Sequence, residues 1–314
     1  MLDSHGVSVG QGGAAATLAV RAPFDLRLTV SALRRLPSST LYSLVGEEFR
    51  FVAPLTGGPR LLAVTSAEGV GLRLRALDGA LGAAEQAEAR RMLARMLDVE
   101  RDLAPLWALV ADQPELAALA PQLAGMKPPR FVSLWETFCQ IVPFQLVSLS
   151  AAIATLNRFV EALGPTVAYE GRDYRGLPSP TTVLAAEYAT LRACGLSEAK
   201  ARTLRELAAR AQTGALEAAD YAGLTDAEAI ARLTQIPGIG PWSAQVALLR
   251  GLGRLTVFPA GDSGATRGLR EVFAERDDPD AAAKELLARM GDWRGYLYFL
   301  LLGRRLLASG GFDR

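Results

Sequence analysis

The sequence predicts an α+β fold that is mainly α, with an antiparallel sheet at the start and an all-helical part after it. Two patterns carry this prediction: apolar and polar residues alternate in short runs before residue 80, and helical periodicity continues from about residue 130 almost to the C-terminus. Half of the 314 residues are hydrophobic and 21% are charged, which is the balance of a globular chain with enough apolar material for a large core. We expect a disordered leader over residues 1–20, an α+β domain over 21–125 and a helical domain over 126–314.

Four short runs in the first part alternate apolar side chains with polar or basic ones, as strands with one solvated face do. They lie at 24–30, 48–52, 60–64 and 71–75, and turns rich in glycine and proline separate them. Two stretches with helical character follow, at about 84–97 and 102–110. The sequence therefore predicts an antiparallel sheet with one face covered by helix.

Capping signals place the helices of the second part. The break at 127–130, which reads Lys-Pro-Pro-Arg, precedes the helical region. Ser197 has the position of an N-cap, and Thr225 with Glu228 has the spacing of a capping box for a helix that reaches Gln235. The pattern predicts helices joined by short Gly/Pro turns, without a sequence repeat.

Residue counts exclude several kinds of active site. The single histidine is His5, in the expected leader, so a Ser-His-Asp triad, a Cys-His pair and a histidine zinc site are excluded. Cys139 and Cys194 stand alone in apolar helical contexts, so we expect buried thiols in a reduced, cytoplasmic protein. The apolar run at 296–302 is too short to cross a membrane, and the leader, which carries Asp3, lacks the basic start of a signal peptide. We expect a monomer without metal, cofactor or membrane segment.

The most informative stretch is a tight turn, Pro237-Gly238-Ile239-Gly240, between two predicted helices, with Pro241 at the first position of the second helix. Its glycines permit backbone angles that other residues avoid, and they let a phosphate approach closely. The helix that follows offers free N–H groups and the positive end of its dipole to that anion. Because the net charge is only +1, a nucleic-acid-binding chain of this composition needs such local contacts. The alternative is a helix corner that only packs.

Further segments accompany the hairpin. A Gly/Pro-rich loop ending in Asp262 follows it, Gln-Leu-Val-Ser lies at 145–148, Leu-Pro-Ser-Pro at 177–180 and Trp-Arg-Gly-Tyr at 293–296. Together they resemble the helix-hairpin-helix DNA glycosylase superfamily, and in particular the bacterial 3-methyladenine DNA glycosylase II family, over residues 129–298. A weaker likeness at Phe24-Asp25 implies that the N-terminal sheet is similar to half of a TATA-binding protein.

The resemblance implies an enzyme that flips a damaged base, in particular an alkylated purine, out of double-stranded DNA and hydrolyses its glycosidic bond. It assigns the catalytic carboxylate to Asp262, which stabilises the positive charge that develops on the sugar. The alternative role of Asp262, an N-cap for the next helix, is compatible with catalysis. Some relatives also cleave the backbone through a lysine just after the hairpin. Here that position is Trp242, which implies a monofunctional hydrolase.

By the same resemblance, Leu146 is the apolar wedge that enters the gap left by the flipped base, and Gln145 is its polar neighbour. The alternative for Leu146 is an ordinary core leucine. The implied base-pocket positions are Trp242, Val246, Ser263, Trp293, Tyr296 and Leu302, and the implied phosphate-binding positions are Pro237, Gly238, Ile239, Gly240, Ser243, Arg267 and Arg270. The pocket is less aromatic than in relatives, and its three remaining aromatic residues have core packing as the alternative role.

This loss of aromatic residues leaves other functions open. One is a non-catalytic DNA-binding or lesion-sensing protein that keeps the hairpin, and another is a glycosylase for a different damaged base. A third is a helical interaction module whose hairpin is purely structural. The presence of Asp262 in its expected context favours the enzyme.

Overall fold

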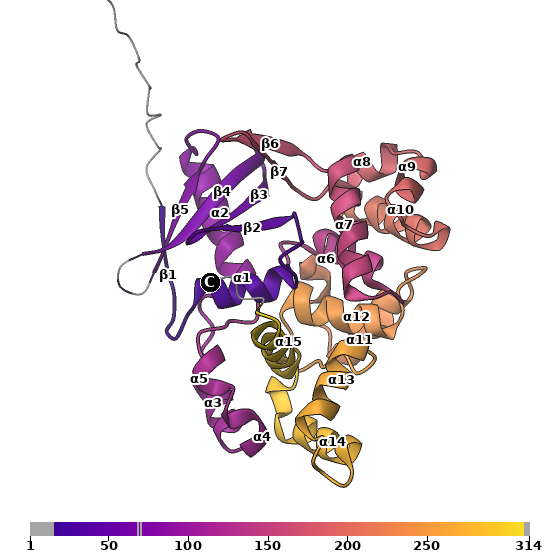
Figure 1. Ribbon diagram of the computed structural model, residues 1–314. Helices are drawn as coiled ribbons and strands as arrows, with labels where there is room; N and C mark the ends of the chain where they lie inside the picture. The colour runs from indigo at the N-terminus through magenta and orange to yellow at the C-terminus, as the bar shows by residue number, and fades with distance from the viewer. Residues whose placement is uncertain (1–15, 68, 70, 311–314) are drawn as a thin grey trace, which may run out of the picture.

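The first layer of the molecule is a five-stranded antiparallel sheet with the strand order β1-β5-β4-β3-β2 (Figure 1). The structure is a computed structural model that describes residues 16–67, 69 and 71–310. The strands are β1 Ala16–Ala19, β2 Tyr42–Val45, β3 Glu48–Leu55, β4 Gly58–Ala67 and β5 Gly71–Ala76. The predicted strands at 48–52, 60–64 and 71–75 are therefore confirmed, together with their antiparallel arrangement.

One face of this sheet is buried because apolar residues of β3 and β4 lie opposite each other across the ladder. Phe49 pairs with Val64 and Phe51 with Leu62, and all four side chains are buried. Helix α2, Ala83–Met96, contacts β3 and β1, so the predicted helix at 84–97 covers the sheet. The pairs of large apolar side chains fix the register, since a slip by one residue would turn them toward solvent.

The predicted strand at 24–30 is wrong, because this segment begins helix α1, Leu26–Arg34. Asp25 caps the helix with its side chain, which accepts a backbone N–H from the first turn over 2.8 Å. Val30 and Leu33 are buried together with the first helical residue, which is the spacing of one helix face. The apolar residues thus follow the period of a helix, and the cap decides against the strand.

The predicted leader over residues 1–20 is wrong at its end. Ala16–Ala19 form β1, in which Ala16 lies opposite Leu74 and Ala19 opposite Gly71 of β5. Backbone hydrogen bonding to the edge of a sheet orders this segment, and Leu18 packs against the main apolar cluster. Residues 1–15 lie outside the described residues.

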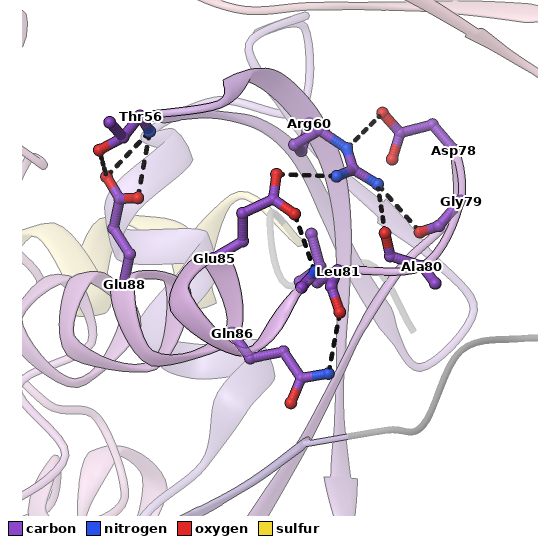
Figure 2. Close-up of polar contacts among 10 residues, drawn as sticks. Thr56, Arg60, Asp78, Gly79, Ala80, Leu81, Glu85, Gln86 and Glu88 are labelled. Atoms are coloured by element: carbon purple, nitrogen blue, oxygen red, sulfur yellow. Dashed lines mark hydrogen bonds and ion pairs between the residues drawn. The ribbon is translucent and has the colours of Figure 1, made fainter.

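Arg60 of β4 fixes the connection that leads from β5 into α2 (Figure 2). Its guanidinium pairs with Asp78 at 3.2 Å and with Glu85 at 2.9 Å, and it donates to the carbonyls of Gly79 and Ala80. Glu85 also accepts the backbone N–H of the residue that precedes α2. One arginine therefore holds the turn and the start of the helix that covers the sheet.

The chain beyond α2 is mainly helical, as predicted. Its helices and helical turns are α3 Ala104–Ala111, α4 Pro114–Ala117, α5 Ala120–Leu123, α6 Leu134–Cys139, η1 Val142–Phe144, α7 Leu149–Leu163, α8 Pro180–Ala185, α9 Tyr188–Ala193, α10 Glu198–Gln212, η2 Ala218–Tyr221, α11 Asp226–Thr234, α12 Pro241–Ala247, η3 Leu248–Leu252, α13 Ser263–Val272, α14 Pro279–Arg289, η4 Gly291–Trp293 and α15 Tyr296–Ala308. Figure 1 shows α7 to α10 on one side of this region and α13 to α15 on the other.

A small β-hairpin corrects the expectation that the second part is all-helical. It consists of β6 Thr166–Tyr169 and β7 Arg172–Arg175, between α7 and α8. Tyr174 of this hairpin belongs to a small buried cluster with Val52 and Leu61 of the five-stranded sheet. The hairpin therefore gains its stability by packing on the sheet, which a local sequence pattern does not reveal.

The predicted caps of the second part are confirmed. Ser197 Oγ accepts the N–H of Lys200 over 3.2 Å at the start of α10. Thr225 and Glu228 form the capping box of α11, in which each side chain accepts the backbone N–H of the other residue. The two capped helices, α10 and α11, adjoin the turn between α11 and α12.

The sheet and the helices share one core. Phe49 of the sheet, Phe138 of α6 and Leu204 of α10 belong to the same buried cluster. A second cluster joins α15 to α13 and to α3. Because the sheet and helices share packing, the domain boundary between residues 125 and 126 stays a prediction. Within the residues that the structure describes, no helix is both long and apolar enough to span a membrane.

Candidate active site

Asp262 ends the loop before α13, and its carboxylate caps that helix. Oδ1 accepts the N–H of Ala265 over 2.9 Å, and Oδ2 accepts the indole N–H of Trp242 over 3.2 Å. The side chain is partly exposed and lies at the positive end of the α13 dipole. Two fixed hydrogen bonds thus hold a carboxylate in one orientation at the surface. Such preorganisation suits a group that stabilises positive charge during a reaction.

Trp242 connects this carboxylate to the predicted hairpin. It is the second residue of α12, and its partly buried side chain packs against the main apolar cluster. A Cβ at Gly261 would lie 3.6 Å from the Trp242 Cβ, so the loop before Asp262 lies directly against the tryptophan. The indole therefore fixes the position of Asp262 relative to the start of α12.

The hairpin turn between α11 and α12 contains two glycines, of which Gly238 is required by the backbone and the packing. Gly238 has a φ of +84°, and a Cβ there would lie 1.9 Å from Thr203 Oγ1 of α10. Gly240 is the N-cap of α12, makes no side-chain cap and has open space where a Cβ would be. Pro241 occupies the first helical position, as predicted. The turn thus presents main chain, with room in front of it, at the start of α12.

Replacement of Gly238 by alanine is expected to destabilise the protein by about 2–4 kcal/mol, because it combines a left-handed backbone with a clash against Thr203. Urea unfolding of the variant measures this loss. Gly223→Ala is the matched control, since Gly223 has open space around its Cβ position and lies in a turn next to α11. Equal midpoints for the two variants would show that the turn relaxes without cost.

Leu146 is fully exposed, at 104% of its reference accessibility, and its backbone has a φ of +55°. It lies in the loop of residues 145–148 between η1 and α7, which we call the Leu146 loop. The neighbouring Val147 is 47% exposed. The interpretation of Leu146 as a core leucine is therefore wrong. Its left-handed backbone is uncommon for a leucine and persists only where the surroundings impose it.

Gln145 imposes this geometry from one side of the loop. Its Nε2 donates to the carbonyl of Gly238 over 2.9 Å and to the hydroxyl of Ser243 over 3.0 Å. On the other side, Ser148 Oγ accepts the N–H of Ala151 over 3.3 Å and so caps α7. The Leu146 loop is thereby tied directly to the hairpin, and through α12 to the carboxylate of the site.

Residues 141–291 match the sequence profile of the HhH-GPD superfamily of base excision DNA repair proteins. The matched region is just under half of the 314-residue chain. The matched region begins just before η1 and contains the Leu146 loop, the hairpin, Trp242 and Asp262. The residues that the structure brings together are thus the ones inside the matched region.

Sequence relatives and a solved structure extend the comparison. The Bacillus subtilis protein YfjP is 30% identical over 190 residues, which is 60% of this chain and 63% of YfjP. A DNA-3-methyladenine glycosylase of Bacillus subtilis is 25% identical over 205 residues, or 65% of this chain and 68% of its own length. The 3-methyladenine DNA glycosylase from Archaeoglobus fulgidus has the same fold, with a TM-score of 0.78 at 22% identity over 93% of this chain and 99% of that chain. The match thus spans less than two thirds of YfjP.

Two of the predicted base-pocket residues lie in the core. Val246 is buried in the main cluster, and Tyr296 is completely buried and donates its hydroxyl to a backbone carbonyl in the core. The reason is that α12 runs inward from the surface and α15 is a central helix of the second cluster. Trp293 and Leu302 pack against this second cluster, whereas Ser263 is exposed beside the carboxylate.

Several of the predicted phosphate-binding side chains are buried or already paired in the structure. Ile239 is buried and donates its N–H within the turn, and Ser243 is buried with its hydroxyl accepting from Gln145. Arg270 forms a two-point ion pair with Asp280 at 2.7 and 2.9 Å, which compensates its charge, whereas Arg267 is exposed. The main chain of the turn around Gly238 and Gly240 remains as the candidate anion contact.

Proposed function

We propose that this chain is a monofunctional DNA glycosylase of base excision repair, which flips an alkylated purine out of double-stranded DNA and hydrolyses its N-glycosidic bond. One observation carries the proposal: the partly exposed carboxylate of Asp262 is bonded to Trp242 of the helix that follows the glycine turn, and the same turn is bonded to the loop that exposes Leu146. The match of residues 141–291 to a superfamily of base excision DNA repair proteins and the relatives named as 3-methyladenine glycosylases support it.

Hydrolysis of the glycosidic bond of an alkylated purine needs little more than one oriented carboxylate. As the base leaves, positive charge develops on the deoxyribose, as in glycoside hydrolysis. A unit charge pair at about 4 Å and an effective dielectric near 20 is worth roughly 4 kcal/mol, or about a thousandfold in rate. Alkylated purines already carry positive charge, so they leave without protonation by an acid. A single carboxylate with a fixed orientation therefore suffices for the reaction that we propose.

The hairpin supplies the proposed contact with a phosphate of the DNA backbone. Main-chain N–H groups at the start of a helix bind a phosphate oxygen without reading the base sequence. The open space in front of Gly240 leaves room for the backbone of a duplex. Because the Leu146 loop is bonded to the same turn through Gln145, a phosphate held there fixes the wedge relative to the flipped nucleotide.

No covalent enzyme–DNA adduct is expected when borohydride is added during turnover, because no lysine is offered at the reaction centre. Lys127 is buried and donates to a carbonyl in the core, Lys200 donates to the carbonyl of Pro143 over 3.1 Å, and Lys284 lies on α14. Trp242 occupies the position just after the hairpin. The measurement is a denaturing gel of the trapped reaction. A retarded DNA band would contradict the monofunctional mechanism.

A panel of duplexes with different damaged bases tests the activity itself. We expect release of free base from methylated purines, with an intact abasic strand as the product. Binding of every damaged duplex without base release would favour the lesion-sensing alternative, and release of another base alone would change the substrate class.

We also propose that the protein acts as a cytoplasmic monomer. Both cysteines, Cys139 and Cys194, are buried free thiols, which is typical of a reducing compartment.

A further inference from the structure

A groove of about 540 Å³ borders the hairpin on the side of α9 and α10. Its walls are the start of α9, one face of α10 and the turn residues Pro237 and Gly238. The volume is far larger than the roughly 10–15 Å³ that a cavity needs on this measure to hold one water molecule, so the groove has room for a polyatomic ligand. Figure 1 shows α9 and α10 on the same side of the molecule as α11 and α12.

An aromatic side chain and an arginine form one wall of the groove. Tyr188 is 44% exposed, which is unusual for an aromatic side chain in the described part of this protein. The Arg205 guanidinium lies over its ring, 4.9 Å from the centroid, and donates to the carbonyl of Ala186 over 2.7 Å. The ring and the guanidinium therefore hold each other in place at the surface.

The groove carries one positive charge that the described residues do not balance. Arg202 pairs with Glu198, and Glu206 pairs with Arg210 at 2.8 Å, so these four charges compensate one another. The described contacts of Arg205 are a carbonyl and an aromatic ring, both neutral. An exposed apolar ring next to an uncompensated cation suits a ligand that alternates apolar and anionic parts.

The groove is continuous with the hairpin. Gly238 is both a wall of the groove and part of the turn that holds a phosphate in the proposed function, and Thr203 of the groove lies directly beneath it. A DNA backbone that contacts the main chain at Gly240 thus has the groove as its next surface on the α10 side.

We propose that this groove binds the sugar–phosphate backbone of the DNA, one or a few nucleotides away from the phosphate at the hairpin. The ring of Tyr188 packs against a deoxyribose, and Arg205 pairs with the adjoining phosphate. The proposal rests on the proposed function, since it extends the same DNA-binding surface. It adds a contact that sets affinity and footprint and takes no part in bond cleavage.

The test measures the affinity of the full-length protein for duplexes with a central tetrahydrofuran abasic analogue. One duplex is long on both sides of the analogue, and two others are shortened to a few base pairs on one side. We expect the wild type to lose about tenfold in affinity when the duplex is shortened on the side of the analogue that reaches the groove. Tyr188→Ala and Arg205→Gln should lose about as much on the long duplex and little more on shortening. Arg205→Gln should also lower the slope of log affinity against log salt by about one.

Two controls separate this contact from a general effect. Tyr188→Phe keeps the ring and should bind like the wild type, and Arg289→Gln removes an exposed arginine of α14 far along the chain and should leave the salt slope unchanged.

The outcomes distinguish the two proposals. If the wild type releases methylated base, but both groove variants bind the long and short duplexes as the wild type does, the groove proposal is overturned and the glycosylase proposal stands. If the wild type neither releases a base nor prefers the abasic duplex, both are overturned. A variant that binds weakly to all duplexes and still responds to shortening also contradicts the groove contact.

Discussion

Asp262→Asn is expected to lower the rate of base release from methylated duplex by about a thousandfold while leaving binding to abasic-analogue DNA almost unchanged. The substitution removes the negative charge that faces the developing positive charge of the sugar and changes little else in shape. Single-turnover release at saturating enzyme measures the rate, and a gel shift with the abasic analogue measures binding.

The substitution should not unfold the protein. Asparagine is as good an N-cap as aspartate, so one side-chain oxygen continues to accept the N–H of Ala265. The asparagine amide then replaces the oxygen that accepts the indole N–H of Trp242, and the loss of that bond costs about 1 kcal/mol. Urea unfolding checks that this small loss is the only effect on stability.

Asp278→Asn supplies the matched control. Asp278 caps α14 in the same way, since its Oδ1 accepts the N–H of Ala281 over 3.0 Å, and this hydrogen bond lies within the first turn of α14. This variant should release base at the wild-type rate. An unchanged rate in Asp262→Asn would show that the aspartate is a helix cap alone and would remove the centre of the proposed mechanism.

Much of the fold could be predicted from local pattern because local physics decides it. Alternation predicts β3, β4 and β5, and the capping box at Thr225 predicts the start of α11. The pattern misled at Leu26–Arg34, where apolar residues spaced by two and by four both occur and the cap at Asp25 selects the helix. It could not find β6 and β7, because Tyr174 of this hairpin packs against Val52 and Leu61, more than 100 residues earlier in the chain.

The site was predictable to the extent that its residues are close in sequence. The turn at 237–240 and the cap at Asp262 each have a local signature, and the link between them through Trp242 spans only 20 residues. The contacts of Gln145 with Gly238 and Ser243 span 93 and 98 residues and have no local signal. The sequence pattern also did not predict the burial of Val246, because a helix of mixed composition does not reveal which of its helical turns enters the core.

Leu146→Ala is expected to lower kcat/KM for base release from a fully paired duplex by about 10- to 100-fold. Flipping a base costs a few kcal/mol of stacking and pairing, and an apolar side chain in the gap recovers part of that cost. The structure presents Leu146 without any core contact to lose, so the stability of the variant should match that of the wild type. The measurement compares duplexes in which the damaged base is paired with duplexes in which it is mismatched.

The mismatch comparison is what identifies a wedge. A mismatched base is already partly unstacked, so the variant should lose much less activity on it than on the paired substrate. Leu146→Met keeps a long apolar side chain and should recover most of the activity, whereas Val147→Ala, in the same loop, should have less than about a threefold effect. An equal loss on paired and mismatched substrates would assign Leu146 to substrate binding in general. In that case the cost of flipping would have to be met by the hairpin and the base pocket, because the Leu146 loop presents no other large side chain as exposed as Leu146.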